Sequence, residues 1–178
     1  MIDQLALDVP ATEARGALLS DDGVYRYNLW RRWGDGLFMG YCMLNPSIAD
    51  ADLDDQTIRR CTYFAKREGF GGIYVVNLFA YRATQQADLW RLGGGGRGPD
   101  NDTHIAAAIV NDRIGMFVAA WGALPEVARG RQHTVRTMFR DAGRALHCPG
   151  LTAKHWPRHP SRLGNATPIS PFPPPLYG

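Results

Sequence analysis

The sequence predicts an α/β protein, folded as one three-layer α/β/α domain (1–178) around a central, mostly parallel sheet. Apolar runs of strand length recur along the chain, and they alternate with segments whose apolar residues follow a helical period. The length of 178 residues suits one domain of roughly 100 to 200 residues. The hydrophobic content of 45% and the charged content of 21% are those of a globular protein.

The first predicted elements are a β-hairpin and a helix. In residues 24–44, two aromatic and aliphatic runs, 24–31 and 37–44, flank the turn-forming sequence Arg-Trp-Gly-Asp-Gly. A helix is predicted between Thr57 and Gly69, because its apolar residues recur at helical spacing.

A buried strand is predicted next. The run IYVVNLFA follows Gly71-Gly72, and its only polar residue is Asn77, which is typical of a strand inside a parallel sheet. Residues 93–99 (GGGGRGP) predict a mobile loop. The sequence Pro-Asp-Asn-Asp that begins at Pro99 then predicts capping of a helix that continues to about Val110.

The second half repeats the alternation of strand and helix. A strand is predicted at residues 114–120, a basic helix at 125–142 and a short strand at 144–148. The proline-rich tail, residues 168–178, is expected to lie extended on the surface.

Charge is distributed unevenly along the chain. Residues 113–178 hold nine of the 20 Lys and Arg but two of the 17 Asp and Glu. Eighteen of the 20 basic residues are Arg, which suits bidentate contact with phosphates, although a GC-rich genome also raises the Arg content. The charge therefore favours nucleic-acid binding without establishing it.

The sequence also indicates a compartment. No stretch approaches the roughly 18 apolar residues that a membrane helix needs, and the first 16 residues lack the basic and apolar segments of a secretory signal. Three cysteines without C-x-x-C spacing argue against a disulfide framework and a zinc ribbon. We expect a cytoplasmic protein with no membrane partner.

Two polar segments stand at predicted strand ends, where ligands of such folds bind. Asn45, Pro46 and Ser47 follow one strand and either form a simple turn or present an amide to a ligand. Asn77 must find partners once it is buried. These are either neighbouring backbone groups or the edge of a base.

A third segment, Trp-Pro-Arg-His-Pro-Ser-Arg-Leu at residues 156–163, follows the last predicted strand. It places His159 beside Arg158 and Arg162, which suits an anionic ligand. His159 could donate to a base carbonyl or to charge on a leaving group. The alternative is a solvated basic loop.

Metal and serine chemistry have weaker support. Acidic residues precede two predicted helices, where capping explains them better than Mg²⁺ binding. These residues are Asp50, Asp52, Asp54, Asp55, Asp100 and Asp102. The histidines lack zinc-ligand spacing, and Ser47 and Ser161 lack a G-x-S-x-G elbow.

In order, the three segments resemble the motifs of the uracil-DNA glycosylase superfamily, which read D-P-Y-H or N-P-G, then L-L-N or T-N-L, then H-P-S-P-L. The counterparts are Asn45-Pro46-Ser47, Val76-Asn77-Leu78 and His159-Pro160-Ser161-Arg162-Leu163. The resemblance covers residues 36–165 and implies a uracil-DNA glycosylase-like fold. The chain more closely resembles a small bacterial and phage family of unknown function with the motifs M-L-N-P-S-x-A-D, D-D-x-T-I-R-R-C, V-N-L-F-A and G-P-D-N-D.

The glycosylase resemblance implies individual roles. Asn45 would position the water that attacks the sugar C1′, Asn77 would read the flipped base, and His159 would stabilise negative charge on the departing base. Leu163 would fill the emptied stack, and Arg162 stands where the family has proline. The other implied DNA contacts are Arg82, Arg158 and Ser161.

Two departures from the family point to the substrate. Ser47, beside Pro46 in the base pocket, stands where uracil-specific enzymes have a tyrosine that excludes a 5-methyl group, so the implied base is a 5-substituted pyrimidine. Asp54 and Asp55 could bind hydroxyl groups of that substituent. The aromatic residue that stacks on the base has no clear counterpart, and the candidates are Tyr41, Tyr63 and Phe64.

The resemblance thus implies a monomeric DNA glycosylase without metal or organic cofactor, acting in repair or anti-phage defence. Three alternatives stay open. They are a nucleosidase or base-exchange enzyme on free nucleotides, a DNA-binding protein that recognises modified bases without cleaving them, and a metal-dependent phosphoesterase that uses the Asp clusters.

Overall fold

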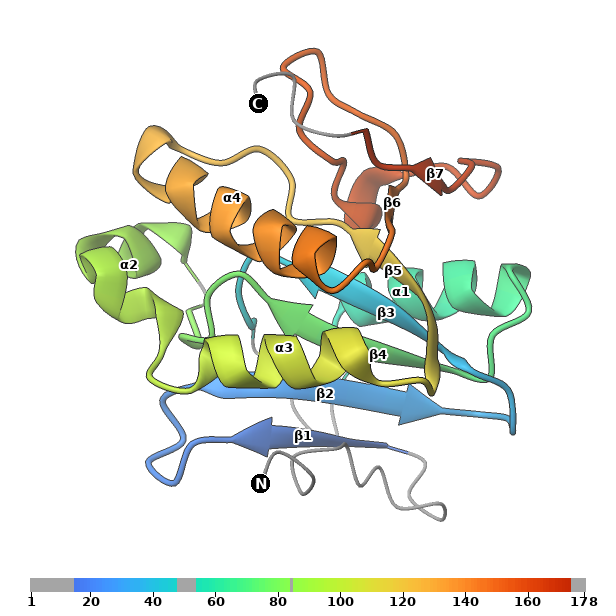
Figure 1. Cartoon of the computed structure of the whole chain (residues 1–178), viewed down its shortest axis with the longest axis horizontal. Coiled ribbons are helices and arrows are strands. Elements are labelled where there is room, and N and C mark those ends of the chain that lie inside the picture. The colour runs from blue at the N-terminus through green and yellow to red at the C-terminus, as the bar shows by residue number, and fades with distance from the viewer. Residues whose placement is uncertain (1–14, 48–53, 84, 174–178) are drawn as a thin grey trace.

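The computed structural model describes residues 15–47, 54–83 and 85–173 and contains one seven-stranded sheet in the order β1-β2-β4-β3-β5-β6-β7 (Figure 1). The strands are β1 (Arg15–Leu19), β2 (Arg26–Arg32), β3 (Phe38–Met43), β4 (Gly72–Asn77), β5 (Ile114–Ala119), β6 (Leu146–Cys148) and β7 (Ser170–Pro171). The helices are α1 (Gln56–Arg67), α2 (Gln86–Arg91), α3 (Asn101–Val110) and α4 (Glu126–Asp141), with short 3₁₀ helices η1 (Gly93–Arg97) and η2 (Pro160–Arg162).

The predicted α/β class is confirmed, but the sheet is mixed rather than mostly parallel. Its centre, β4-β3-β5-β6, is parallel, whereas β1, β2 and β7 run antiparallel to their neighbours. Every residue of β3 and β4 is buried, which is expected for strands with a partner on each side and helices above and below. The antiparallel strands occupy the two edges.

The predicted hairpin of residues 24–44 is wrong in its pairing, although both of its strands exist. β4 lies between β2 and β3, so residues 33–37 cross over the start of β4 instead of forming a turn. At this crossing the N–H groups of Trp33 and Gly34 donate to the Gly71 carbonyl, and the Gly71 N–H donates to Leu37. The glycines that suggested a hairpin turn permit this close approach.

Because the chain crosses so closely here, any side chain at Gly71 should lower the stability of the fold. A Cβ atom there would lie 2.5 Å from the backbone nitrogen of Gly36, so Gly71→Ala should lower the free energy of unfolding by about 2 kcal/mol. Gly130 is the matched control, because it lies inside α4 with nothing within 4 Å of an added Cβ, and Gly130→Ala should stabilise by roughly 0.5–1 kcal/mol. Urea unfolding of both variants checks the prediction, and equal stability of the two would contradict it.

The core consists of two apolar clusters, one on each face of the sheet. Strand β3 alternates between them: Met39 and Tyr41 pack with α1, whereas Phe38 and Cys42 belong to the cluster of α3 and α4. Figure 1 shows α3 and α4 in front of the sheet and α1 behind it. Helices therefore cover both faces, and the carboxyl ends of β3, β4 and β5 lie side by side.

Most predicted elements agree with the structure. The predicted helices 57–69 and 125–142 correspond to α1 and α4, and the helix ending near Val110 corresponds to α3. Residues 93–99, predicted as a mobile loop, contain η1, and the carbonyls of Gly96 and Arg97 accept from the N–H groups of Tyr81 and Ala80. β1 and α2 were not predicted.

Ser170 and Pro171 of the predicted C-terminal tail form a strand that extends the sheet. β7 pairs with β6, and Phe172 packs edge-on against Trp121 with ring centroids 5.8 Å apart. Residues 174–178 of the predicted tail lie outside the described residues. Within the described parts of the chain, no helix has the length and apolar character needed to cross a membrane.

Candidate functional site

A cavity of about 190 Å³ lies at the carboxyl ends of the central strands, and all three predicted segments reach it. Asn45 follows β3, Asn77 ends β4, and His159 precedes η2. A water molecule occupies roughly 30 Å³ in the liquid, so the cavity has room for several waters or for one small planar ring. The position agrees with the rule that open α/β sheets bind ligands beyond the carboxyl ends of their strands.

Asn45 is held by its own side-chain amide. Its Nδ2 donates to the carbonyl oxygens of Pro46 (2.9 Å) and Ala83 (3.0 Å), so both N–H groups have backbone partners. The amide therefore offers its remaining group, the acceptor Oδ1, to a ligand or a water. Pro46, which fixes this turn, is buried.

Asn77 is 1% exposed, and its Nδ2 has no hydrogen-bond partner among the described residues. The backbone carbonyls of Asn77 and Leu78 do have a side-chain partner: Nδ2 of Asn101, at the start of α3, donates to them at 3.0 Å and 3.1 Å. An unsatisfied buried donor is costly, and in a cavity of this size it is satisfied either by a water molecule or by a ligand.

His159 lines the same cavity as a neutral hydrogen-bond donor. Its Nδ1 accepts from the Ser161 N–H (3.3 Å) and lies 2.9 Å from Ser161 Oγ, so in the neutral ring the proton is on Nε2. Burial lowers the pKa of His159 below its ordinary 6.5; the Asp55 carboxylate opposes this change and Arg162 adds to it. At neutral pH the uncharged imidazole is therefore the major form.

Asp55 and Ser47 both line the cavity and are hydrogen-bonded to each other. The Ser47 hydroxyl bonds to Asp55 Oδ2, while Asp55 Oδ1 accepts from the Ile58 N–H at 2.8 Å. The second bond caps α1, as predicted from the acidic run. Asp54 is not among the lining residues; its carboxylate pairs with Arg31 Nε at 2.7 Å, so the structure does not place it for ligand contact.

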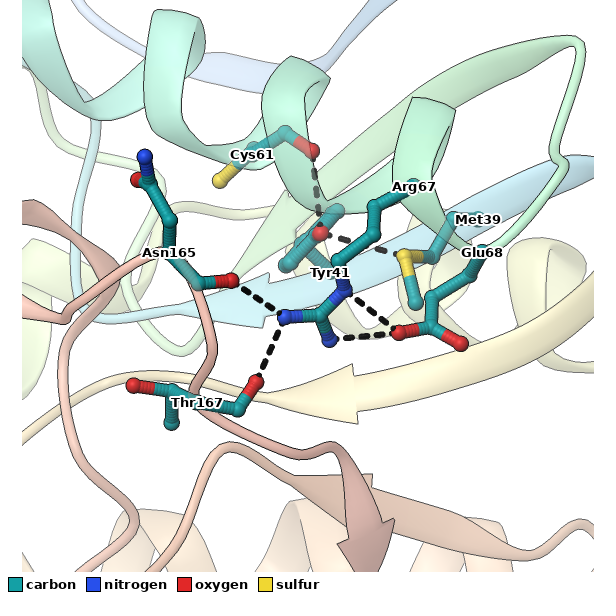
Figure 2. Close-up of polar contacts among 7 residues, drawn as sticks. All are labelled: Met39, Tyr41, Cys61, Arg67, Glu68, Asn165 and Thr167. Carbon is teal, nitrogen blue, oxygen red and sulfur yellow. Dashed lines mark hydrogen bonds and ion pairs between the residues drawn. The ribbon is translucent and has the colours of Figure 1, made fainter.

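The aromatic candidates for stacking do not line the cavity. Tyr41 is 1% exposed under α1, where its hydroxyl lies 3.1 Å from both the Cys61 carbonyl and the Met39 sulfur (Figure 2). Tyr63 is exposed and Phe64 is buried, and neither is a lining residue. The aromatic side chain that does line the cavity is Trp121, which follows β5.

Of the residues predicted to contact DNA, some are exposed near the cavity and others are not. Arg158 and Arg162 are exposed beside His159, whereas Leu163 is only 7% exposed and does not project. Arg82 is directed elsewhere, with its Nη1 donating to the Gly23 carbonyl at 3.1 Å.

Two arginines of α1 hold the segment that follows His159. Arg67 Nη1 donates to the carbonyls of Asn165 and Thr167, both at 2.7 Å, and Arg67 also pairs with Glu68 (Figure 2). Arg60 donates to the Leu163 carbonyl at 2.7 Å. α1 thus fixes the loop that presents His159.

Trp121 and Arg26 are among the lining residues that sequence reasoning missed. Arg26 begins β2 and is 3% exposed, so it places a buried positive charge at the cavity. An arginine within an aromatic strand was the available signal. In residues 15–47, 54–83 and 85–173, no group of three or more His, Cys, Asp or Glu side chains is arranged to hold a metal ion.

One protein-family model matches the part of the chain that forms this cavity. A model described as "Protein of unknown function (DUF1643)" matches residues 26–161, about three quarters of the chain. The chain belongs to the DUF1643 family. The matched region includes Asn45, Asn77 and His159, and the predicted membership of a family of unknown function is confirmed. No curated protein and no solved structure matches this DUF1643 chain.

Proposed function

We propose that this protein is a DNA glycosylase that hydrolyses the N-glycosidic bond of a modified, 5-substituted pyrimidine and leaves an abasic site, in repair or anti-phage defence. The observation that carries the proposal is the convergence of Asn45, Asn77 and His159 on one cavity. The three residues come from segments far apart in the sequence. Helices on both faces of the sheet support the three-layer, glycosylase-like arrangement.

The chemistry needs little covalent help. A water oxygen bonds to the sugar C1′, the bond from C1′ to the base nitrogen breaks, and the base leaves with the electron pair through an oxocarbenium-like state. The proton that the water loses passes to solvent, and the released base takes up a proton from solvent, so that the products are the abasic sugar and the neutral base. His159, as a neutral Nε2–H donor, stabilises negative charge on the base. The acceptor Oδ1 of Asn45 orients the water, and no metal or organic cofactor takes part.

Base recognition falls to Asn77 and to the Ser47–Asp55 pair. The Asn77 amide reads the edge of the base. Ser47 is small enough to leave room for a 5-substituent, and Asp55 can accept a hydrogen bond from a hydroxyl on it. Asp54 has no part in this contact, because it pairs with Arg31.

DNA is the proposed partner of a monomeric enzyme. Arg158 and Arg162 lie exposed beside His159, where they can contact phosphates next to a flipped nucleotide. The burial of Leu163 favours a second candidate, a nucleosidase or base-exchange enzyme on free modified nucleotides, since that reaction needs no side chain to fill a vacated stack.

Base release tests the proposal. Duplexes that each carry one 5-substituted pyrimidine are incubated with the protein, and free base and alkali-labile breaks are measured beside the corresponding free nucleosides. Asn45→Ala should slow release roughly tenfold, because the water loses its acceptor. Asn111→Ala is the matched control outside the cavity. Release from nucleosides alone would support the second candidate, and no release from either would refute both.

A further inference from the structure

Two buried hydrogen-bond donors without a protein partner in the described part of the chain belong to residues that line the cavity. They are Nδ2 of Asn77 and Nε1 of Trp121, in side chains 1% and 2% exposed. Buried polar atoms in proteins are nearly always bonded, so each exception needs an explanation. Because both donors belong to residues of one cavity with room for a small ring, a single ligand bound there can satisfy both in place of water.

The backbone fixes Trp121 at the cavity. The Ala120 N–H donates to the Cys42 carbonyl at 2.8 Å, so the chain follows β3 up to the residue before Trp121. Gly122 then turns the chain with φ of 76°, and a Cβ atom added there would lie 3.6 Å from the Cβ of His159. The turn after Trp121 therefore packs against the residue that we assign to the leaving group.

The indole ring of Trp121 is also held in place. Its body belongs to the apolar cluster of α3 and α4, and Phe172 packs against it at an interplanar angle of 74°. A ring held in this way is a rigid donor, which loses little conformational entropy when it binds a ligand. For comparison, the Nε1 of Trp33 is fully accounted for, because it donates to the Phe70 carbonyl at 2.9 Å.

We propose that Trp121 is a specificity-determining residue of this cavity and that its Nε1–H donates a hydrogen bond to an acceptor atom of the bound base. The inference rests on the proposed function for the identity of the ligand. β3 lies between β4 and β5, so Asn77 at the end of β4 and Trp121 just after β5 belong to chain segments about 10 Å apart. The two donors therefore reach the base from different sides, and the base carries separate acceptors for them, as ring carbonyls or as an oxygen on the 5-substituent.

Trp121→Phe tests the hydrogen bond alone, because phenylalanine keeps an aromatic ring against Phe172 and removes the N–H. Trp30→Phe is the matched control, since the Nε1 of Trp30 also lacks a partner among the described residues but Trp30 does not line the cavity. With the DNA that the wild type cleaves best, Trp121→Phe should raise KM roughly tenfold and Trp30→Phe should leave it unchanged.

A second measurement separates this inference from the proposed function. Free uracil, 5-hydroxymethyluracil and 5-hydroxymethylcytosine are added at millimolar concentration, and the rise in unfolding temperature is recorded. A rise lost in Trp121→Phe and kept in Trp30→Phe supports the inference even if the wild type releases no base from DNA. An unchanged KM and an unchanged rise in Trp121→Phe would overturn it. A wild type that shows neither release nor a rise would overturn both proposals.

Discussion

Replacing His159 with alanine should lower kcat for base release by roughly 100- to 1000-fold, the usual effect of removing one donor aimed at developing negative charge. The Nε2–H of His159 forms its bond fully only when the base departs, so KM should change little. Single-turnover measurement of free base gives the rate constant of the cleavage step itself, and steady-state measurement gives kcat and KM. An equal loss in kcat and in DNA affinity would instead show that His159 acts in binding.

The pH profile of the wild type tests the protonation state of His159. Burial disfavours the charged ring, so the pKa of His159 lies below 6.5 and the neutral donor predominates at every pH above it. The rate should therefore stay level through pH 7 and fall only as the pH drops through that lowered pKa. A rate that rises as the pH falls would mean that the imidazolium is the active form.

Burial is the main cause of the lowered pKa of His159, and two arginine variants test the smaller contribution of Arg162. The Arg162 charge lowers the pKa of His159, so Arg162→Ala should move the acidic fall in rate to higher pH. Arg158 is exposed on the same loop and is not among the groups that act on that pKa, so Arg158→Ala should leave the profile in place. Identical shifts in both variants would contradict the assignment.

The helices and strands were predictable because each has a local signature, whereas the pairing of β2 and β3 was not. A short glycine-rich connection predicts a hairpin whenever the two flanking strands are neighbours. Here β4, formed by residues far along the chain, lies between them, and the same glycines are used for a crossing at Gly36 and Gly71. No feature local to residues 24–44 carries that information.

The candidate site was predictable where a polar residue interrupts an apolar pattern. Asn77 stands out in its strand, and Asn45 follows one directly. Trp121 gave no such signal, because an aromatic residue after a buried strand is typical of a core. Tyr41 was misplaced for a related reason: period-two alternation shows which residues share a face but not which face meets the cavity, and this one packs under α1.

Asn77→Leu should abolish base reading and at the same time stabilise the protein. Leucine has a similar size and removes a buried donor that lacks a partner among the described residues, so the free energy of unfolding should rise by about 1 kcal/mol, or roughly 2–4 °C in Tm. The bound base would lose its hydrogen bonding to the Asn77 amide, and kcat/KM should fall at least about 100-fold.

Asn101→Leu is the matched control for the prediction that Asn77→Leu raises stability while it lowers activity. Asn101 is equally buried, but its Nδ2 donates to the carbonyls of Asn77 and Leu78, so its replacement should lower the free energy of unfolding by about 1–3 kcal/mol. Thermal unfolding and base release are measured on both variants. If Asn77→Leu destabilised the fold as much as Asn101→Leu, the Asn77 amide would be a structural group and its assignment to base reading would fail. A fold that gains stability when Asn77 is lost would show that this cavity retains an unsatisfied donor for a ligand.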